Sequence, residues 1–251
     1  MPVRNGEEFL SDAVADIKKN MDPNDEIIVI NDGSEDRTEI ILKEWRNCDS
    51  RVNIINTNGV GIVKSLNLGI NEAQNNLIAR FDVDDRYSPA RISVQRKAFE
   101  RDTAAVFSDY AIISETNKYL GTIPTALFNN QTAISLVKSQ RTPHPSAMLN
   151  KEAFLDVGGY LVDDFPAEDL SLWLRMSKSY KLKGVPNVSL RYRLNKKSIT
   201  NQNRTLAIKK KDFVLEKYQI SRTSIKNCIE SWSETMKFYE ETIQHHNHLL
   251  V

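Results

Sequence analysis

The chain is organised around residues 81–85, which read FDVDD. The apolar run LIA at residues 77–79 is typical of a buried strand, and Ser88-Pro89 favours the start of a helix. Three carboxylates at one strand end raise one another's pKa, so a fold that keeps them ionised needs a cation. Oxygen ligands favour Mg²⁺, Mn²⁺ or Ca²⁺ over Zn²⁺. The alternative is a polar turn that only ends the strand.

Charge is unevenly distributed along the chain. Its 251 residues carry a formal net charge of only +1, but residues 176–226 hold fourteen Lys or Arg against Asp212 and Glu216, a net charge of +12. An acidic half beside a basic C-terminal region favours a metal and an anionic substrate or surface, although a solvated helix face also explains such runs. The length allows one large domain, with or without an appendage.

The composition indicates a cytoplasmic protein. Cys48 and Cys228 lack the spacing of metal ligands, so we predict two free thiols in a reducing compartment. No apolar run approaches the roughly 20 residues that span a bilayer, and the first residues lack the apolar segment of a signal peptide. We expect contact with a membrane surface at most, and no nucleic-acid partner.

The first hundred residues alternate between apolar runs and polar turns. The runs at residues 26–30 and 52–55 predict buried strands, each followed by a turn and a helical pattern. The helix between them is expected to face inward through Ile40, Ile41 and Trp45. Such alternation predicts a parallel α/β sheet with right-handed crossovers.

Polar side chains follow two of the predicted strands. Because ligands of parallel sheets bind outside the carboxyl ends of the strands, Asp32 and Asp82 can face one crevice. The pair Gly59 and Gly61 lacks the third glycine of a dinucleotide fingerprint, so no nicotinamide or flavin cofactor is expected.

The second half of the chain follows another pattern. Apolar runs at residues 104–108, 119–123, 182–185 and 188–194 predict strands without regular alternation with helices. The remainder, residues 205 to about 246, is polar and mostly helical, with an apolar stripe beside the lysines at residues 209–211. The stripe consists of Ile208, Phe213, Val214, Leu215 and Tyr218.

Glu168 and Asp169 open a predicted helix that carries Leu170, Trp173 and Leu174 at helical spacing. Carboxylates at a helix start are favoured by the helix dipole and by unpaired N–H groups. The pair therefore has two interpretations, which are simple capping and a base that is kept ionised.

Eight short motifs occur in the order that one enzyme family has. They are Pro2-x-x-Asn5-Gly6, residues 26–34 (EIIVINDGS), Asn67-x-Gly69, Asp82-x-Asp84-Asp85, His144-Pro145-Ser146, Gly158-Gly159-Tyr160, Glu168-Asp169-x-x-Leu172-Trp173-x-Arg175 and Tyr192-Arg193. From Pro2 to about Thr200 the chain resembles the family 2 glycosyltransferases of the GT-A fold. It is most similar to those that build bacterial surface polysaccharides: O-antigen lipopolysaccharide, capsule and exopolysaccharide.

The resemblance implies an α/β fold of the GT-A type. We expect a single Rossmann-like domain over residues 1–200, with a mixed, mostly parallel central sheet flanked by helices. Residues 1–110 would bind the nucleotide sugar and residues 111–200 the acceptor. Residues 201–251 would form a C-terminal helical extension.

The resemblance also implies an activity, which is inverting, metal-dependent hexosyl transfer. The donor would be a nucleotide-diphosphate sugar, with UDP favoured, and the acceptor a saccharide or an undecaprenyl-diphosphate-linked saccharide. Asp169 would be the general base, and Asp84 would bind Mn²⁺ or Mg²⁺. The donor nucleotide would lie against Pro2, Arg4, Asn5, Asp32, Lys64, Asn67, Asp82 and Val83. Supporting residues would be Asp85, His144, Glu168 and Arg193.

The chain departs from the family's pattern in three places. Before Met1 the family carries most of a first strand, so this chain either starts late or lacks a few residues. Arg4 stands where many members have an aromatic residue, although a guanidinium can also stack on a base. Asn195 replaces a frequent histidine, so no histidine metal ligand is expected there. The basic region beyond residue 200 favours peripheral contact with the inner membrane.

Two other functions fit parts of the pattern. The sequence of residues 82–84 resembles the nucleophile motif of haloacid dehalogenase-like phosphatases, but that family requires glycine and then threonine or serine, where this chain has Asp85-Arg86. The other alternative is a non-catalytic nucleotide-sugar-binding protein of the same fold. The presence of both Asp84 and Asp169 argues against it.

Overall fold

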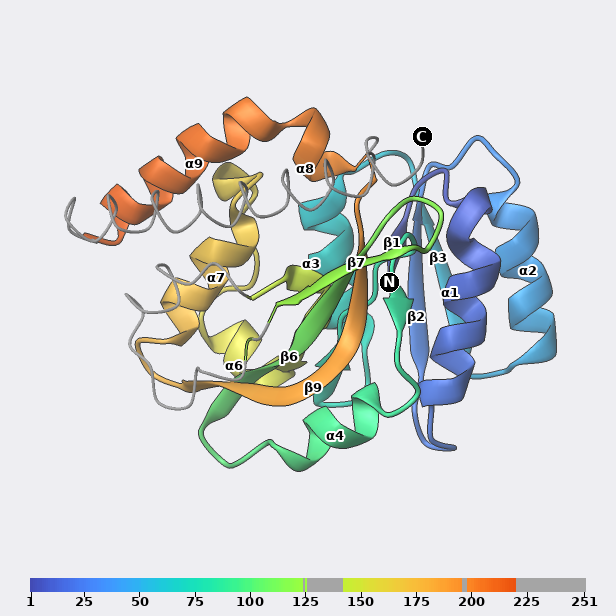
Figure 1. Ribbon diagram of the computed structural model, residues 1–251, viewed down its shortest axis with the longest axis horizontal. Helices are drawn as coiled ribbons and strands as arrows, with labels where there is room; N and C mark the ends of the chain where they lie inside the picture. The colour runs from blue at the N-terminus through green and yellow to red at the C-terminus, as the bar shows by residue number, and fades with distance from the viewer. Residues whose placement is uncertain (124, 126–141, 196–197, 220–251) are drawn as a thin grey trace.

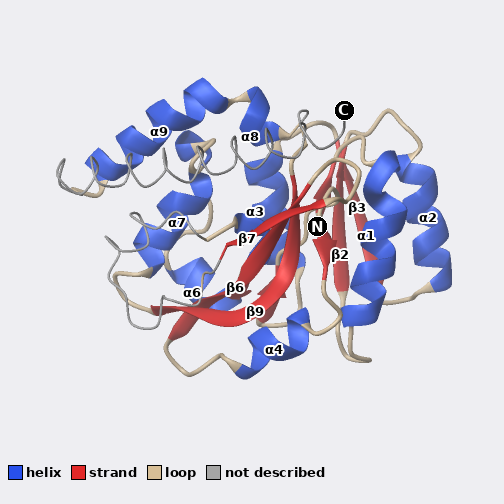
Figure 2. Ribbon diagram, viewed as in Figure 1, coloured by secondary structure: helices blue, strands red, loops and turns tan. Residues whose placement is uncertain are grey.

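The computed structural model describes residues 1–123, 125, 142–195 and 198–219 (Figure 1). Its strands lie in the middle of the molecule with helices on both sides (Figure 2). The α-helices of this part are α1 (Glu7–Asn20), α2 (Thr38–Cys48), α3 (Ile62–Glu72), α4 (Arg91–Lys97), α6 (Lys151–Asp156), α7 (Glu168–Met176), α8 (Ile199–Gln202) and α9 (Arg204–Lys217). The strands are β1 (Pro2–Val3), β2 (Ile27–Asp32), β3 (Val52–Thr57), β4 (Leu77–Ala79), β5 (Arg86–Tyr87), β6 (Thr103–Ile113), β7 (Tyr119–Ile123), β8 (Met148–Asn150) and β9 (Lys181–Arg193).

The first three strands form a parallel sheet in the order β1-β2-β3. Pro2 lies opposite Ile30, and β2 pairs with β3 in continuous register from Ile27 and Val52 to Asp32 and Thr57. Every residue of β2 is buried, as its run of β-branched side chains predicts for a central strand. The βα alternation predicted for this part of the chain is therefore confirmed.

The remaining strands form a mixed sheet in the order β4-β8-β6-β9-β5, with β7 paired to β6. Only β6 and β9 run parallel in it; the other pairs are antiparallel. The strand expected at residues 77–79 is present as β4, but its partner is β8 and not a strand of the parallel sheet. This sheet is thus mixed, as expected, but most of its pairs are antiparallel, and the expected predominance of parallel pairs holds only for the β1-β2-β3 sheet.

One strand, β9, stands where two were predicted. Its register against β6 shifts between Ser108 and Asp109, which lie opposite Val185 and Val188. Pro186 lies in the interval and has no N–H to donate to the ladder. A bulge at this point lets the strand continue past the proline.

α2 faces inward through Trp45, as predicted, and Ile41 packs against the core, but Ile40 does not face inward. Leu42 and Trp45 are buried in the largest apolar cluster, whereas Ile40 is 52% exposed. Thr38, Leu42 and Trp45 follow one another at helical spacing on the buried side. The inward prediction for Ile40 was wrong because the buried side of the helix is centred on Thr38, Leu42 and Trp45, and Ile40 lies away from it.

α4 begins at Arg91 with Ala90 as its cap, two residues after the helix start predicted at Ser88-Pro89. The N–H of Ser88 donates to the carbonyl of Ser189 at 3.0 Å and extends the pairing of β5 with β9. The carbonyl of Ser88 accepts from the N–H of Arg91 at 3.1 Å. Ser88 thus ends a strand and forms a turn.

α9 packs against α7 (Figure 1). Val214 and Leu215 are buried in one apolar cluster with Ala167 and Leu174. Within the predicted apolar stripe, Ile208 and Phe213 instead face the surface of the described structure. The prediction that Ile208 and Phe213 belong to a buried apolar stripe was therefore wrong, because both lie off the face of α9 that meets α7.

The described helices include none that is long and apolar enough to cross a membrane. Cys48 at the end of α2 is an exposed free thiol, as predicted. Cys228 and the helical pattern predicted beyond residue 219 lie outside the described residues.

Candidate active site

Asp32 is fully engaged at the end of β2. One carboxylate oxygen accepts from the hydroxyl of Thr57 at 2.6 Å and from the N–H of Val60 at 2.7 Å, and the other accepts from the N–H of Gly61 at 2.8 Å. Burial of Asp32 opposes its ionisation, but these hydrogen bonds and the charge of Arg4 together lower its pKa below the ordinary value. Asp32 is therefore a fixed negative charge that also shapes the loop after β3.

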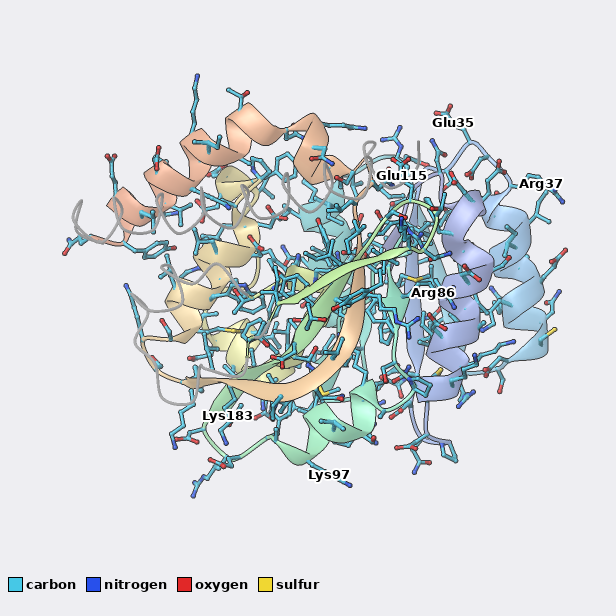
Figure 3. The ribbon with its side chains drawn as sticks, viewed as in Figure 1. Glu35, Arg37, Arg86, Lys97, Glu115 and Lys183 are labelled. Carbon is cyan, nitrogen blue, oxygen red and sulfur yellow. The ribbon has the colours of Figure 1, made fainter. Side chains whose placement is uncertain are left out.

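The loop after β1 is joined to the loop after β2. The N–H of Asn5 donates to the hydroxyl of Ser34 at 3.0 Å, and its side-chain oxygen accepts from the N–H of Glu35 at 2.8 Å. The N–H of Gly6 donates to the hydroxyl of Thr38 at 2.8 Å. Of the predicted donor residues here, Pro2 is buried in β1, while Arg4 and Asn5 are exposed. The outer side chains of this region point into solvent, as Glu35 and Arg37 do in Figure 3.

An internal cation lies beside the acidic turn after β4. The guanidinium of Arg80, itself 7% exposed, forms an ion pair with Asp82 at 2.5 Å. The N–H of Asp82 donates to the hydroxyl oxygen of Tyr87 at 2.6 Å. Val83 is half-buried against the main core. Arg80 thus supplies part of the positive charge that the sequence predicts for this cluster.

Asp84 and Asp85 occupy different surroundings. Asp84 is half-buried and accepts from the side-chain amide of Asn195 at 3.4 Å. Asp85 is buried; one oxygen accepts from the N–H of Arg193 at 2.8 Å, and the other has no hydrogen-bond partner among the described residues. Burial first, and then the neighbouring carboxylates, raise the pKa of both groups. The predicted mutual repulsion is therefore present, although burial is the larger effect.

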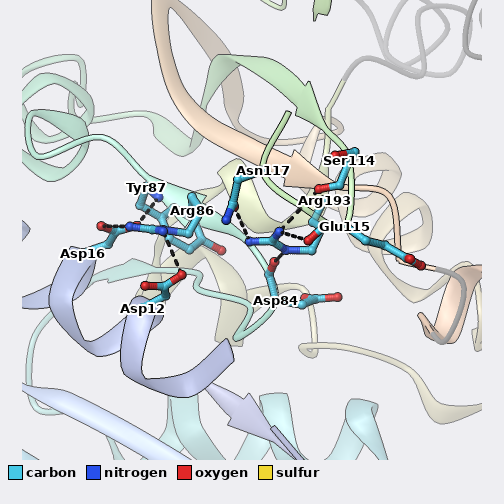
Figure 4. A network of polar contacts seen from close by, with 9 residues as sticks. All are labelled: Asp12, Asp16, Asp84, Arg86, Tyr87, Ser114, Glu115, Asn117 and Arg193. Atoms are coloured by element: carbon cyan, nitrogen blue, oxygen red, sulfur yellow. Dashed lines mark hydrogen bonds and ion pairs between the residues drawn. The ribbon is translucent and has the colours of Figure 1, made fainter. Parts of the chain in front are cut away.

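Arg193 holds this turn in place (Figure 4). Its Nε donates to the carbonyl of Asp84 at 2.6 Å, and Nη1 donates to the carbonyl of Glu115 at 2.8 Å. Nη2 donates to the side chain of Asn117 at 2.8 Å, and the guanidinium lies over the ring of Phe9 at 5.0 Å. One buried arginine thus connects α1, the acidic turn and the β6–β7 hairpin.

The second pair of carboxylates lies at the start of α7. The N-terminal residue before the helix, Ala167, offers no side-chain cap, and the carboxylate of Asp169 accepts from the N–H of Leu170 at 2.7 Å. Glu168 is 8% exposed, and one of its oxygens meets no hydrogen-bond partner in the described part of the chain. Burial, then the charge of Asp169, raises the pKa of Glu168 to about 7. Burial also raises the pKa of Asp169.

Arg80 also acts on this second pair. After the larger effect of burial, its positive charge lowers the pKa of both Glu168 and Asp169. Asp82, which is paired with Arg80, raises the pKa of Glu168 in turn. Two motifs more than 80 positions apart in the sequence are therefore brought into one electrostatic environment.

His144 forms part of the wall beside these groups. Its Nε2 and the hydroxyl of Tyr160 are hydrogen-bonded at 2.6 Å, and its ring meets Trp173 edge-on at 6.1 Å between centroids. Burial and the charge of Arg80 lower the pKa of His144 well below its ordinary value, so the imidazole is neutral at pH 7.

Two predicted donor residues lie on α3. The side-chain amide of Asn67 donates to the carbonyl of Tyr160 at 2.9 Å, and its oxygen accepts from the N–H of Tyr160 at 3.0 Å. Gly159 has a φ of 65°, and a Cβ there would lie 3.0 Å from the Asn67 oxygen. Asn67 thus fixes the turn before α7, while Lys64 is exposed.

Among the described residues, no group of three His, Cys, Asp or Glu side chains could hold a metal ion. The donors at the acidic turn are carboxylate oxygens, and Mg²⁺ commonly binds one or two carboxylates together with substrate phosphates. The carboxylate of Asp84, the predicted metal ligand, is an oxygen donor of this kind, whereas the carboxylate of Asp82 is paired with Arg80.

Sequence reasoning missed Arg80 and Lys211. Arg80 separates the apolar run at residues 77–79 from Phe81, and a charge in such a run is an available signal. Lys211 acts on the carboxyl of Asp169, whose pKa it lowers, but it is 42 positions away and is one of three consecutive lysines. Its special position could not be recognised without the packing of α9.

The fold and these sites define an α/β scaffold with two acidic motifs, one at a strand end and one at a helix start. The model of glycosyl transferase family 2 matches residues 1–158, and the chain belongs to this family. It is 28% identical over 176 residues to the amylovoran biosynthesis glycosyltransferase AmsE of Erwinia amylovora, covering 67% of this chain and 64% of that one. It is 29% identical over 184 residues to the O-antigen biosynthesis glycosyltransferase WbnJ of Escherichia coli, covering 69% of each.

An uncharacterized glycosyltransferase of Haemophilus influenzae is 27% identical over 203 residues. This match covers 76% of the chain but 63% of the relative, so the chain spans less than two thirds of that protein's length.

Solved structures establish the GT-A fold. TarS of Staphylococcus aureus, residues 1–349 in complex with UDP-GlcNAc, has a TM-score of 0.67 at 15% identity, covering 88% of this chain and 72% of that one. The mannosyltransferase PcManGT of Pyrobaculum calidifontis, in complex with GDP-Man and Mn²⁺, has a TM-score of 0.65 at 11% identity. The match covers 100% of this chain and 79% of that one. The expected fold and family are confirmed, and the phosphatase alternative is dropped.

Proposed function

We propose that this protein is an inverting glycosyltransferase that moves a sugar from a nucleotide-diphosphate donor to a saccharide or lipid-diphosphate-linked acceptor. The product would be part of a bacterial surface polysaccharide. The observation that carries this proposal is the shared environment of Asp82 and of the Glu168-Asp169 pair around Arg80. A donor-side motif and a candidate base that are both acted on by the charge of Arg80 suit a single displacement.

The donor would bind in the half formed by residues 1–110. Asp32, with its low pKa, offers a permanent acceptor to the N–H of a base, and Arg4 beside it can stack on the ring. Asp82 would lie near the ribose, next to Val83, and Lys64 would approach the phosphates. Uridine is favoured because TarS has been solved with UDP and with UDP-GlcNAc. Pro2, Asn5 and Asn67 would also lie against the nucleotide.

A divalent cation, Mn²⁺ or Mg²⁺, would be held by Asp84 with the donor diphosphate. When bound, such an ion acts as a Lewis acid that stabilises the negative charge of the leaving diphosphate. PcManGT was solved with Mn²⁺, which supports this choice. Asp85 and Arg193 keep the Asp84 turn in shape, so that its carboxylate stays available.

Asp169 would take the proton of the acceptor hydroxyl as that oxygen attacks the anomeric carbon. Attack from the face opposite the nucleotide, in one displacement, inverts the anomeric centre. A raised pKa brings a carboxylate closer to the operating pH and makes it a better base. Glu168 and His144 would shape the acceptor side, within residues 111–200.

Ligand-dependent thermal stabilisation tests this function. The protein is heated with nucleoside diphosphates and sugar nucleotides, each with and without Mn²⁺, because a ligand of the folded state raises apparent stability. We expect one uridine sugar nucleotide to stabilise wild type with Mn²⁺, and the same ligand to lose its Mn²⁺-dependent effect on Asp84→Ala. A panel without any stabilising nucleotide would contradict the proposal.

The acceptor is proposed to lie at the cytoplasmic membrane face. Within the C-terminal extension of residues 201–251, α9 exposes Leu206, Ile208 and Phe213 on either side of the lysines at residues 209–211. Such a surface suits anionic lipids. In co-sedimentation we expect binding to vesicles with anionic lipid and much weaker binding to neutral vesicles. Equal binding to both would contradict the membrane proposal.

A further inference from the structure

Asp164 lies in the segment that leads into α7. It ends the short 3-10 helix η3 (Val162–Asp164), and its side chain is fully buried. Its carbonyl accepts from the N–H of Ala167 at 2.8 Å, and its carboxylate accepts from the hydroxyl of Ser171 in α7. We call the contact between Asp164 and Ser171 the brace. The brace joins the two ends of residues 164–171, and the carboxylate pair of α7 lies between these ends in the chain.

A cation from α9 pairs with the buried Asp164. The ammonium group of Lys217 donates to both oxygens of the carboxylate, at 2.8 and 3.1 Å. The side chain of Lys217 is 35% exposed, whereas that of Asp164 is 0% exposed. Burying a carboxylate is costly unless an opposite charge is paired with it. Lys217 therefore brings from α9 the opposite charge that this buried group requires.

Uncharged contacts join the same two helices. Val214 of α9 and Ala167 are buried in one apolar cluster. The hydroxyl of Tyr218, the residue after Lys217, is hydrogen-bonded to the hydroxyl of Ser171 at 3.3 Å. α7 and α9 lie side by side, as Figure 1 shows. The end of α9 thus meets the start of α7 and the turn before it through an ion pair, a hydrogen bond and apolar packing.

We propose that Lys217 is a positioning residue for Asp169: its ammonium group holds the Asp164 carboxylate in the brace, and the brace fixes the start of α7. The inference rests on the proposed role of Asp169 as the base. Ala167, just before the helix, offers no side-chain cap, so the turn before α7 is joined to the helix by the brace. The site then extends beyond residues 1–158, the part that the family model matches. The end of α9 would be required for turnover and not only for stability.

Steady-state transfer tests this role, with the donor identified by thermal stabilisation and a matched acceptor. We expect Lys217→Met to lower kcat about tenfold to a hundredfold, because a displaced base attacks the acceptor proton from the wrong position. Donor affinity, measured by calorimetric titration, should stay at the wild-type value. Lys217→Arg keeps the positive charge and should keep most of the turnover. Lys97→Met, which removes an exposed lysine of α4 (Figure 3), is the matched control and should leave kcat unchanged.

A double variant separates loss of the brace from general damage to the fold. Asparagine at position 164 keeps an oxygen for the Ser171 hydroxyl but carries no charge, so it requires no cation. We expect Asp164→Asn combined with Lys217→Met to recover most of the turnover that Lys217→Met loses. Wild-type kcat in Lys217→Met would overturn the inference. A double variant as slow as Lys217→Met would also overturn it, because the unpaired charge of Asp164 would then not be the cause of the loss.

Amide hydrogen exchange provides a readout that does not depend on activity. The N–H of Ala167 donates to Asp164, and the N–H of Ser171 donates to the carbonyl of Ala167 at 3.1 Å. We expect both amides to exchange faster in Lys217→Met than in wild type, while the amides of β2 keep their rates. Unchanged exchange at both amides, or an equal increase in β2, would overturn the inference. If wild type transfers no sugar, the proposed function fails, and the exchange still decides whether Lys217 holds the start of α7.

Discussion

Asp32 and the Glu168-Asp169 pair are carboxylates in shielded positions with opposite properties. Asp32 accepts three hydrogen bonds, and its pKa is lowered. Glu168 has an oxygen without a partner among the described residues, and the pKa values of both members of the pair are raised. Burial opposes ionisation at both places, so the difference is due to the number of N–H and O–H donors that meet the carboxylate.

The difference separates binding from proton transfer. A carboxylate surrounded by donors remains an anion over a wide pH range and can only attract or accept hydrogen bonds. A desolvated carboxylate with few donors takes up a proton readily, which a general base must do. In this protein the parallel sheet carries the first kind, and the start of α7 carries the second. Arg80, which is paired with Asp82, lowers the pKa of Glu168 and of Asp169 through its positive charge.

The largest effect is expected for Asp169→Asn. An amide keeps the shape of the side chain but cannot take up a proton, so turnover should fall about a hundredfold to ten-thousandfold, equivalent to roughly 3 to 5 kcal/mol of barrier. Donor affinity and melting temperature should change little. The measurement is turnover with a matched acceptor, beside calorimetric titration of the donor.

Simple capping predicts another outcome for Asp169→Asn. Asparagine caps a helix nearly as well as aspartate, so a capping residue would lose about 1 kcal/mol of stability or less and almost no turnover. Near-normal transfer by this variant would return Glu168 and His144 to consideration as the base.

Glu168→Gln should change how stability depends on pH. The pKa of Glu168 is about 7 in the folded protein against an ordinary value of 4.5, so the folded state binds the extra proton between these values. Wild-type stability should therefore be complete below about pH 4.5 and fall as the pH rises to 7. At pH 8 the glutamine variant should exceed wild type by roughly 3 kcal/mol, and near pH 4 the two should agree.

Denaturant unfolding at a series of pH values measures this difference. The exposed Glu8, replaced in Glu8→Gln, is the control and should follow wild type throughout. If the unfolding free energies of wild type and Glu168→Gln changed in parallel with pH, the ionisation of Glu168 would carry no cost in stability. Glu168 would then not differ from Asp32 in the way described.

Asp32→Ala should destabilise the donor half. It leaves the hydroxyl of Thr57 and the N–H groups of Val60 and Gly61 without their acceptor, which costs about 2 to 3 kcal/mol because the loop is partly solvated. Urea unfolding followed by tryptophan fluorescence measures this cost. Glu35→Ala, a nearby carboxylate that points into solvent, should stay within about 0.5 kcal/mol of wild type. Equal stability of the two variants would contradict the account of Asp32.

Local patterns predicted the first half of the fold well. The short β-branched run at residues 26–30, followed by a polar turn, favours a buried strand, and its polar end places Asp32 at the sheet edge. Ile40 shows the limit, because the phase of a helix depends on which of several apolar residues meets the sheet. The local sequence thus predicts where a strand forms, whereas packing decides which side of a helix is buried.

Long-range pairings could not be predicted from the sequence. β6 and β9 are adjacent and parallel although about 80 positions separate them, and nothing local specifies that choice. For the same reason Arg80 and Lys211 were not recognised, since each acquires its importance from a carboxylate far away in the chain. Asp32 and Asp169 were predicted from motifs, but their opposite pKa shifts depend on donors that the fold supplies.

The smallest effect, expected for Thr57→Val, sharpens the comparison most, because it removes one donor from Asp32 and keeps the shape of the residue. The Thr57 hydroxyl donates to Asp32 at 2.6 Å, while the two N–H groups remain in place. The unfolding free energy should fall by about 1 kcal/mol, and the midpoint of the Asp32 carboxyl titration should move to higher pH. Thr57→Ser keeps the hydroxyl and should resemble wild type in both measurements. An unchanged midpoint in Thr57→Val would mean that donors do not set the difference between Asp32 and Asp169, and that burial alone would have to explain it.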